Sequence, residues 1–176
     1  MSITVPDQAK LHRWVLWLFA RRLARQLHLK SYTLAGSYRR GKWWCNDIDL
    51  LVPIASESEG SALIARLYQL GWRYTPYRRT SENVFSHQFQ KRVDRKVIVL
   101  DLFLSTPGTW GNALLFTTGS KNFNDQIRED IVKMGYSWAN PRYFTHIKTG
   151  TQCSFATEEG ALAFLGLPWV KPKNRL

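Results

Sequence analysis

The chain has 176 residues, and its 25 Lys and Arg against 13 Asp and Glu give a formal net charge of +12. Hydrophobic residues make up 44% of the chain and aromatic residues 14%, which excludes a disordered basic tail and allows a buried core. The longest apolar run, Trp14 to Ala20, is well below the ~20 residues that span a bilayer, and Met1 to Lys10 lacks the pattern of a secretory signal.

The positive charge indicates a polyanionic partner, and nucleic acid is the first expectation, because a basic surface attracts phosphates. Two alternatives stay open: the charge serves solubility alone, or the partner is an acidic lipid surface. Cys45 and Cys153 are too few and too far apart for a disulfide scaffold or a zinc site. We therefore expect an intracellular protein in a reducing setting that is neither secreted nor embedded in a membrane.

The first expected element is a helix over Asp7–Leu27, where Leu16 and Leu23 share an apolar face. Trp14 and Leu18 fall on the other side of this helix, among arginines. They are compatible with a surface that contacts a partner, but we favour packing beneath a neighbouring segment.

Strand and helix patterns alternate through the next part of the chain. Strands are expected at Ser31–Ala35, Asp47–Ile54, Trp72–Tyr77, Val84–Gln90 and Lys96–Leu104, and a helix at Ser61–Leu70. The turn-rich cluster from Ser105 to Gly108 then marks a domain boundary. Residues 1–105 are therefore predicted to form an α+β sheet domain.

Residues 106–176 are predicted to form a second, smaller α+β unit. Helices are expected at Trp110–Thr117 and Asn122–Met134, followed by a hairpin within Tyr136–Thr149. Thr157 is expected to cap a final helix that has Glu158 and Glu159 in its first turn.

Three carboxylates stand out because they lie inside apolar strand patterns. Asp47 and Asp49 point to the same side of one strand, and Asp101 joins them if its strand lies alongside. Three ionised carboxylates in one place repel one another unless a cation lies between them. Hard oxygen ligands suit two Mg²⁺ ions, or Mn²⁺ as a substitute, and such a pair promotes displacement at phosphorus.

A possible phosphate site precedes this acidic pair. Gly36 allows close approach of backbone N–H groups to phosphate oxygens, Ser37 adds a hydroxyl donor and Arg40 adds a forked donor. Each signal is weak alone, but the combination predicts a nucleotidyl-transfer site.

The segment from Gly36 to Gly41, GSYRRG, followed by Asp47-Ile48-Asp49, resembles the nucleotidyltransferase superfamily, and especially the polymerase beta-like, family X DNA polymerases. The block from Ala113 to Ser120, continuing through Phe123, Asn124 and Arg128, is similar to that family's thumb motif. The length resembles the minimal form of the family's small viral members, with a palm (residues 1–105) and a thumb (residues 106–176). This resemblance implies a monomer in the cytoplasm or nucleus of a host cell, or in a virion.

The resemblance implies that Asp47, Asp49 and Asp101 are the catalytic, metal-binding residues. It implies a nucleotide-binding set of Gly36, Ser37, Arg40, Asn46, Phe116, Thr117, Gly119 and Asn124. The expected DNA contacts are Lys42, Lys121 and Arg128, with Arg78 and Arg79 among further phosphate contacts. Phe116-Thr117 stands where many relatives have Tyr-Phe, and Val99 stands where an arginine often precedes the third aspartate.

The predicted function is therefore a magnesium-dependent, DNA-directed DNA polymerase that adds dNTPs to a primer 3′-hydroxyl in gapped or nicked DNA, in DNA repair. One alternative is a template-independent nucleotidyltransferase that acts on RNA ends, a protein or a small molecule. Another is a non-catalytic DNA-binding protein that has the same fold.

Overall fold

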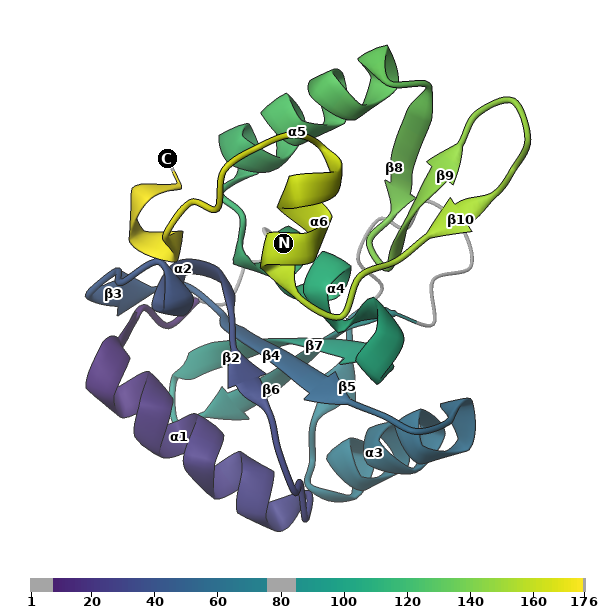
Figure 1. Ribbon diagram of the computed structural model, residues 1–176. Helices are drawn as coiled ribbons and strands as arrows, with labels where there is room; N and C mark the ends of the chain where they lie inside the picture. Colours follow the sequence, from purple (N-terminus) through teal and green to yellow (C-terminus); the bar gives the residue numbers. More distant parts are fainter. Residues whose placement is uncertain (1–7, 76–84, 176) are drawn as a thin grey trace, which may run out of the picture.

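A computed structural model describes residues 8–75 and 85–175, and a five-stranded mixed sheet lies at its centre (Figure 1). The strands are β2 (Thr33–Leu34), β4 (Ile48–Pro53), β5 (Arg73–Tyr74), β6 (Ser86–Val93) and β7 (Lys96–Ser105). Their order across the sheet is β2-β4-β7-β6-β5. The central strands β4 and β7 are parallel, and the other neighbours are antiparallel.

Two helices, α1 (Arg13–Gln26) and α3 (Glu57–Gln69), cover one face of the sheet (Figure 1). Their buried leucines pack with Leu50 and Leu102 in the largest hydrophobic cluster. Because successive side chains of a strand point to opposite faces, this packing turns Asp49 and Asp101 toward the other face.

The second half of the chain lies over that other face (Figure 1). It contains α4 (Trp110–Thr118), α5 (Lys121–Lys133), α6 (Glu158–Phe164) and an antiparallel sheet of β8 (Tyr136–Asn140), β9 (Tyr143–His146) and β10 (Gln152–Cys153). Short 3₁₀ turns are present at η1 (Pro107–Thr109) and η2 (Pro172–Asn174). Ala113 of α4 packs with Leu51 and Phe103 of the central sheet, so the two halves share a hydrophobic cluster.

A two-stranded sheet and a short helix complete the fold beside the central sheet. Strands β1 (Leu11–His12) and β3 (Trp44–Cys45) pair with each other, and the short helix α2 (Gly36–Arg39) follows β2 directly. None of the helices within the described residues is long and apolar enough to cross a membrane.

The predicted fold class, α+β with a mixed-sheet palm and a small α+β thumb, is confirmed. Most expected elements are present with shifted ends, whereas the boundary between residues 105 and 106 stays a prediction. The helix expected from Asp7 begins only at Arg13, after the strand β1. The interpretation that Trp14 and Leu18 are packed was wrong, because their exposed fractions are 63% and 59%.

Other differences are local. The expected Gly36-Ser37 turn is the start of α2, and the expected hairpin has β10 as a third strand. Asp7, the ends of the predicted strands Trp72–Tyr77 and Val84–Gln90, and the candidate contacts Arg78 and Arg79 lie outside the described residues.

Candidate active site

Asp49 and Asp101 occupy directly opposed positions on the parallel strands β4 and β7. On the other side of β7, Gln88 of β6 is opposite Asp101, and its Nε2 donates a hydrogen bond of 2.9 Å to Asp101 Oδ1. Asp47 precedes β4 by one residue. The strand register therefore brings two of the three predicted acids side by side and adds an amide that the sequence did not point to.

Burial raises the pKa values of these carboxyls, and the charges of neighbouring acids add to this effect at Asp49 and Asp101. Burial raises the pKa of Asp49 well above its usual value, and the charges of Asp47 and Asp101 raise it further, whereas Arg40 lowers it. Burial also raises the pKa of Asp101, to about 6. The hydrogen bond from Gln88 lowers this pKa, and the charge of Asp47 raises it. Burial raises the pKa of Asp47, against the lowering effects of a backbone hydrogen bond and Arg40.

Gly36 and Ser37, at the start of α2, lie against these carboxylates. Gly36 has a φ of +50°, and a β-carbon at this position would lie 1.7 Å from Asp49 Oδ2. Ser37 Oγ is buried and makes no hydrogen bond to nitrogen or oxygen of the described residues. The first turn of α2 therefore presents its backbone beside Asp49, and the buried Ser37 hydroxyl interacts with the Cys45 thiol.

The turn between α4 and α5 faces α2 from the second half of the chain. Arg40 Nη1 donates a hydrogen bond to the Thr118 carbonyl, next to Gly119, which has a φ of +61°. The Gly119-Ser120 peptide is cis. Ser120 Oγ caps α5 by accepting a hydrogen bond of 3.3 Å from the Phe123 N–H. These contacts place the predicted thumb motif next to the predicted phosphate site.

A cavity of about 680 Å³ lies between these elements. All eight residues of the predicted nucleotide-binding set line it, together with Asp47 and Asp49. Lys42 and Lys121, predicted as DNA contacts, also line it, as do Trp44 and Phe103, which sequence reasoning did not assign to the site. Asp101 and Arg128 are not among its lining residues.

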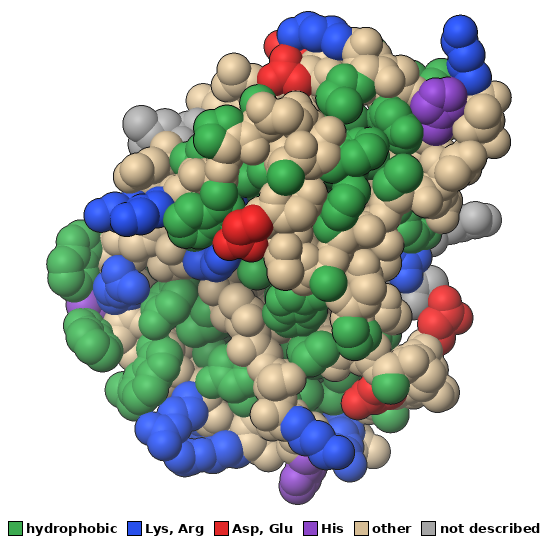
Figure 2. Space-filling model, viewed as in Figure 1, with side chains coloured by type: hydrophobic (Ala, Val, Ile, Leu, Met, Phe, Trp, Pro, Cys, Tyr) green, Lys and Arg blue, Asp and Glu red, His purple; other side chains and the backbone are tan. Residues whose placement is uncertain are grey.

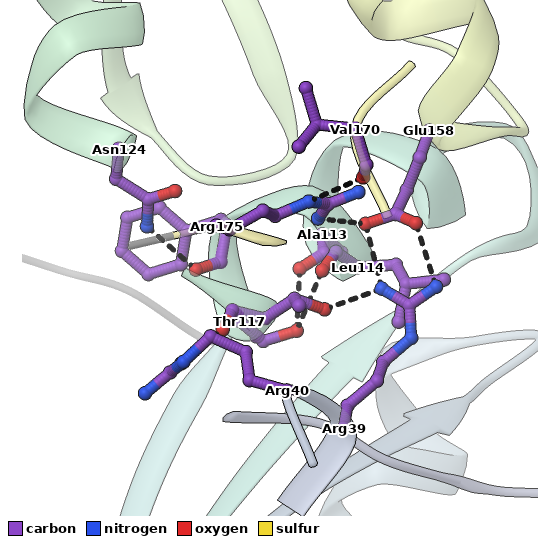
Figure 3. A network of polar contacts seen from close by, with 11 residues as sticks. Arg39, Arg40, Ala113, Leu114, Thr117, Asn124, Glu158, Val170 and Arg175 are labelled. Atoms are coloured by element: carbon purple, nitrogen blue, oxygen red, sulfur yellow. Dashed lines mark hydrogen bonds and ion pairs between the residues drawn. The ribbon is translucent and has the colours of Figure 1, made fainter. Parts of the chain in front are cut away.

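Several side chains in the cavity wall are held by the thumb itself. The Thr117 hydroxyl donates to the Ala113 carbonyl at 2.8 Å, and Asn124 Nδ2 donates to the Phe116 carbonyl at 2.8 Å (Figure 3). Asn124 Oδ1 is buried and has no hydrogen-bond partner among the residues that the structure describes. Asn124 therefore keeps one acceptor available inside the cavity wall.

Arg128 lies further along α5, in an aromatic environment. Its guanidinium carbon is 5.5 Å from the ring centroid of Phe116 and 5.8 Å from that of Trp138, and it forms a 2.6 Å ion pair with Asp125. These contacts fix Arg128 beside the cavity wall.

A buried ion-pair network joins α2 to the second half of the chain (Figure 3). Both carboxylate oxygens of Glu158 accept hydrogen bonds from Arg39, at 2.8 and 2.7 Å, and Oε1 also accepts one from Arg175 at 2.7 Å. Burial alone would raise the pKa of Glu158, but the hydrogen bonds from Arg39 and Arg175 lower it below its usual value. Sequence reasoning assigned Glu158 only to a first helical turn, and no local pattern links it to Arg39.

The acids fit a hard divalent cation by their chemistry, because buried carboxylate oxygens with raised pKa values gain most from a nearby positive charge. Within residues 8–75 and 85–175, however, no three or more His, Cys, Asp or Glu side chains are gathered closely enough to hold a metal ion.

Comparison with known proteins supports these observations. Residues 113–176 match the DNA polymerase beta thumb family. A DNA polymerase lambda from Arabidopsis thaliana is 25% identical over an alignment of 169 residues. The match covers 80% of this chain and 31% of the plant protein. The chain thus spans less than a third of that relative's length.

The second half of the chain is thus similar to the thumb of DNA polymerase beta, and it packs on the mixed sheet beside the cavity. More particularly, both comparisons confirm the similarity to family X DNA polymerases that the two sequence motifs indicate.

Proposed function

We propose that this protein is a DNA-directed DNA polymerase that adds a dNTP to a primer 3′-hydroxyl in gapped or nicked DNA, in DNA repair. The observation that carries the proposal is the opposition of Asp49 and Asp101 on neighbouring strands. Asp49 lines a cavity that also contains the start of α2 and the thumb turn.

The chain's own groups suit a triphosphate. The Ser37 hydroxyl lies in the cavity wall, Arg40 carries a forked cation, and the cavity is also lined by Lys42 and Lys121. These groups would bind the β- and γ-phosphates and compensate their charge. The phosphates would in turn lie beside the carboxylates, because Gly36 allows α2 to contact Asp49.

Asp47, Asp49 and Asp101 would hold the metal ions, two Mg²⁺ with Mn²⁺ as a possible substitute. When bound, such ions supply activation of the attacking oxygen and charge neutralisation at phosphorus. Asp101 would accept the proton of the primer 3′-hydroxyl, because burial raises its pKa to about 6, toward neutral pH.

The thumb residues would orient the sugar and base. Phe116, Thr117 and Gly119 line the cavity, and their side chains or backbone would face the sugar. Asn124 would direct its free Oδ1 toward the edge of the incoming base. Lys42, Lys121 and Arg128 would contact DNA, and we propose that the protein acts as an intracellular monomer.

Primer extension with one dNTP at a time tests the proposal. On a duplex with a one-nucleotide gap, we expect Mg²⁺-dependent incorporation of the dNTP complementary to the template base. Incorporation that ignores the template base would contradict the polymerase and favour the template-independent nucleotidyltransferase. Absence of incorporation under all metal and nucleotide conditions would favour a DNA-binding protein without catalysis.

A further inference from the structure

Two large aromatic side chains project into solvent at β3, beside the candidate active site. Trp43 and Trp44 are 63% and 61% exposed. Figure 2 shows hydrophobic side chains protruding at the edge of the molecule where Figure 1 places β3, with Lys or Arg side chains close by. Large apolar side chains exposed side by side are unfavourable in water, so these neighbouring tryptophans indicate a binding surface.

These rings are held in place. His12 of β1 is opposite Trp44 in the β1–β3 pair, and its ring stacks on Trp43 at 5.8 Å and meets Trp44 edge-on at 5.2 Å. The Arg13 guanidinium carbon lies 5.8 Å from the Trp43 ring centroid and 5.0 Å from that of Tyr38. His12, Trp43 and Trp44, here called the tryptophan platform, are thus ordered before any partner binds.

The chemistry around the platform favours a single-stranded nucleic acid as the partner. Arg13 and the exposed Lys42 place positive charge beside the rings, in a chain with a net charge of +12. Unpaired bases stack on indole faces while their phosphates attract Arg and Lys, whereas paired bases expose no free face to stack. An apolar protein partner would explain the rings but not the adjacent cations.

The position of the platform relates it to the nucleotide site. Trp44 and Lys42 belong to the cavity wall that also contains Asn46 and Asp47. We propose that the tryptophan platform binds unpaired nucleotides of single-stranded DNA and holds them next to the nucleotide cavity. The inference rests on the proposed function only for the choice of DNA, since the platform itself needs neither metal nor dNTP.

Fluorescence anisotropy of a labelled oligo-dT of about twelve nucleotides, without Mg²⁺ or dNTP, tests this proposal separately from catalysis. We expect the Trp43→Ala/Trp44→Ala double variant to bind the single strand at least about tenfold more weakly than wild type, as loss of base stacking predicts. Binding to a blunt duplex of the same length should change by less than about twofold, because phosphate contacts dominate there.

A second variant and a control separate stacking from folding. Trp43→Tyr/Trp44→Tyr keeps aromatic faces and should keep most of the single-strand affinity. Tyr68→Ala removes an aromatic side chain that is 51% exposed on α3, away from β3 (Figure 1), and should leave single-strand binding unchanged.

Three outcomes would overturn the proposal. One is unchanged single-strand binding by the alanine variant, and another is an equal loss for single-stranded and duplex DNA. The third is sedimentation of wild type as a dimer and of the alanine variant as a monomer, which would assign the platform to a contact between two copies of this chain.

Discussion

Gly36 packs so closely on Asp49 that a β-carbon at residue 36 would lie 1.7 Å from Asp49 Oδ2. Asp49 is in turn opposite Asp101 in the register of β4 and β7. The backbone that begins α2 is thus fitted directly to the carboxylate, and the left-handed φ of +50° adds a second requirement for glycine.

We expect Gly36→Ala to reduce nucleotide incorporation by about a hundredfold or more, because the methyl group must displace Asp49 or α2 and small misplacements at a reacting centre cost about this much. Single-turnover incorporation measures the effect. Gly41→Ala is the matched control: Gly41 also has a positive φ, of +82°, but nothing lies within 4 Å of its β-carbon position. The control should lose at most about 1–3 kcal/mol of stability through strain and keep its rate. Equal rate losses in both variants would refute this role of Gly36.

Gln88 is expected to position Asp101 and to tune its protonation. Gln88→Leu removes the hydrogen bond that lowers the pKa of Asp101, so that pKa should rise above its present value of about 6. The acidic limb of the pH profile of incorporation should then move to higher pH. Gln90→Leu, an exposed position of the same strand, serves as the control. Superimposable profiles for wild type and Gln88→Leu would show that the bond has no such role.

Glu158 is expected to stabilise the attachment of the second half of the chain to α2. Glu158→Gln leaves Arg39 and Arg175 without their buried counter-charge, which costs about 3–5 kcal/mol for pairs of this kind. Thermal denaturation should show a lower Tm at neutral pH, whereas Glu159→Gln, exposed on the same helix, should change little.

The pH dependence of this effect follows from the lowered pKa of Glu158. A carboxyl whose pKa is lower in the folded than in the unfolded state stabilises the fold above its unfolded value of 4.5, and this contribution is lost as pH falls through the folded pKa. The Tm difference between wild type and Glu158→Gln should therefore shrink in acid. A constant difference down to about pH 2 would argue against the ionised network.

The contribution of Asp101 to stability depends on pH in the opposite direction. Its pKa is raised to about 6 in the folded protein, so its contribution to stability is present at low pH and is lost as pH rises from its usual value of 3.8 through about 6. Without divalent cations, Asp101→Asn should therefore be at least as stable as wild type at neutral pH. Mg²⁺ should raise the Tm of wild type at neutral pH. It should raise that Tm less near pH 5, where Asp101 is protonated, and it should not raise the Tm of Asp101→Asn. Equal stabilisation of both proteins by Mg²⁺ would place the metal elsewhere.

The acidic face of the site could be predicted from alternation, because Asp47 and Asp49 are two residues apart at the start of an otherwise apolar strand. The register that places Asp49 opposite Asp101 depends on how distant strands pair, and α3, β5 and β6 lie between these two strands in the sequence. The hydrogen bond of Gln88 follows from that same pairing and has no local signal.

The network around Glu158 was not predictable for a similar reason. Its partners are 119 and 17 residues away in sequence, so neither helical nor strand periodicity relates them. Trp14 and Leu18 show the same dependence on tertiary packing. Their apolar character suggested burial, but both are exposed among the residues that the structure describes.

Single-turnover incorporation of a complementary dNTP into a one-nucleotide gap, with and without Mg²⁺, is the most direct measurement on the paired aspartates. We predict rapid Mg²⁺-dependent extension by wild type and a loss of about a thousandfold or more in both Asp49→Asn and Asp101→Asn, with DNA binding retained. Extension by either variant at the wild-type rate would contradict a polymerase site at these two residues.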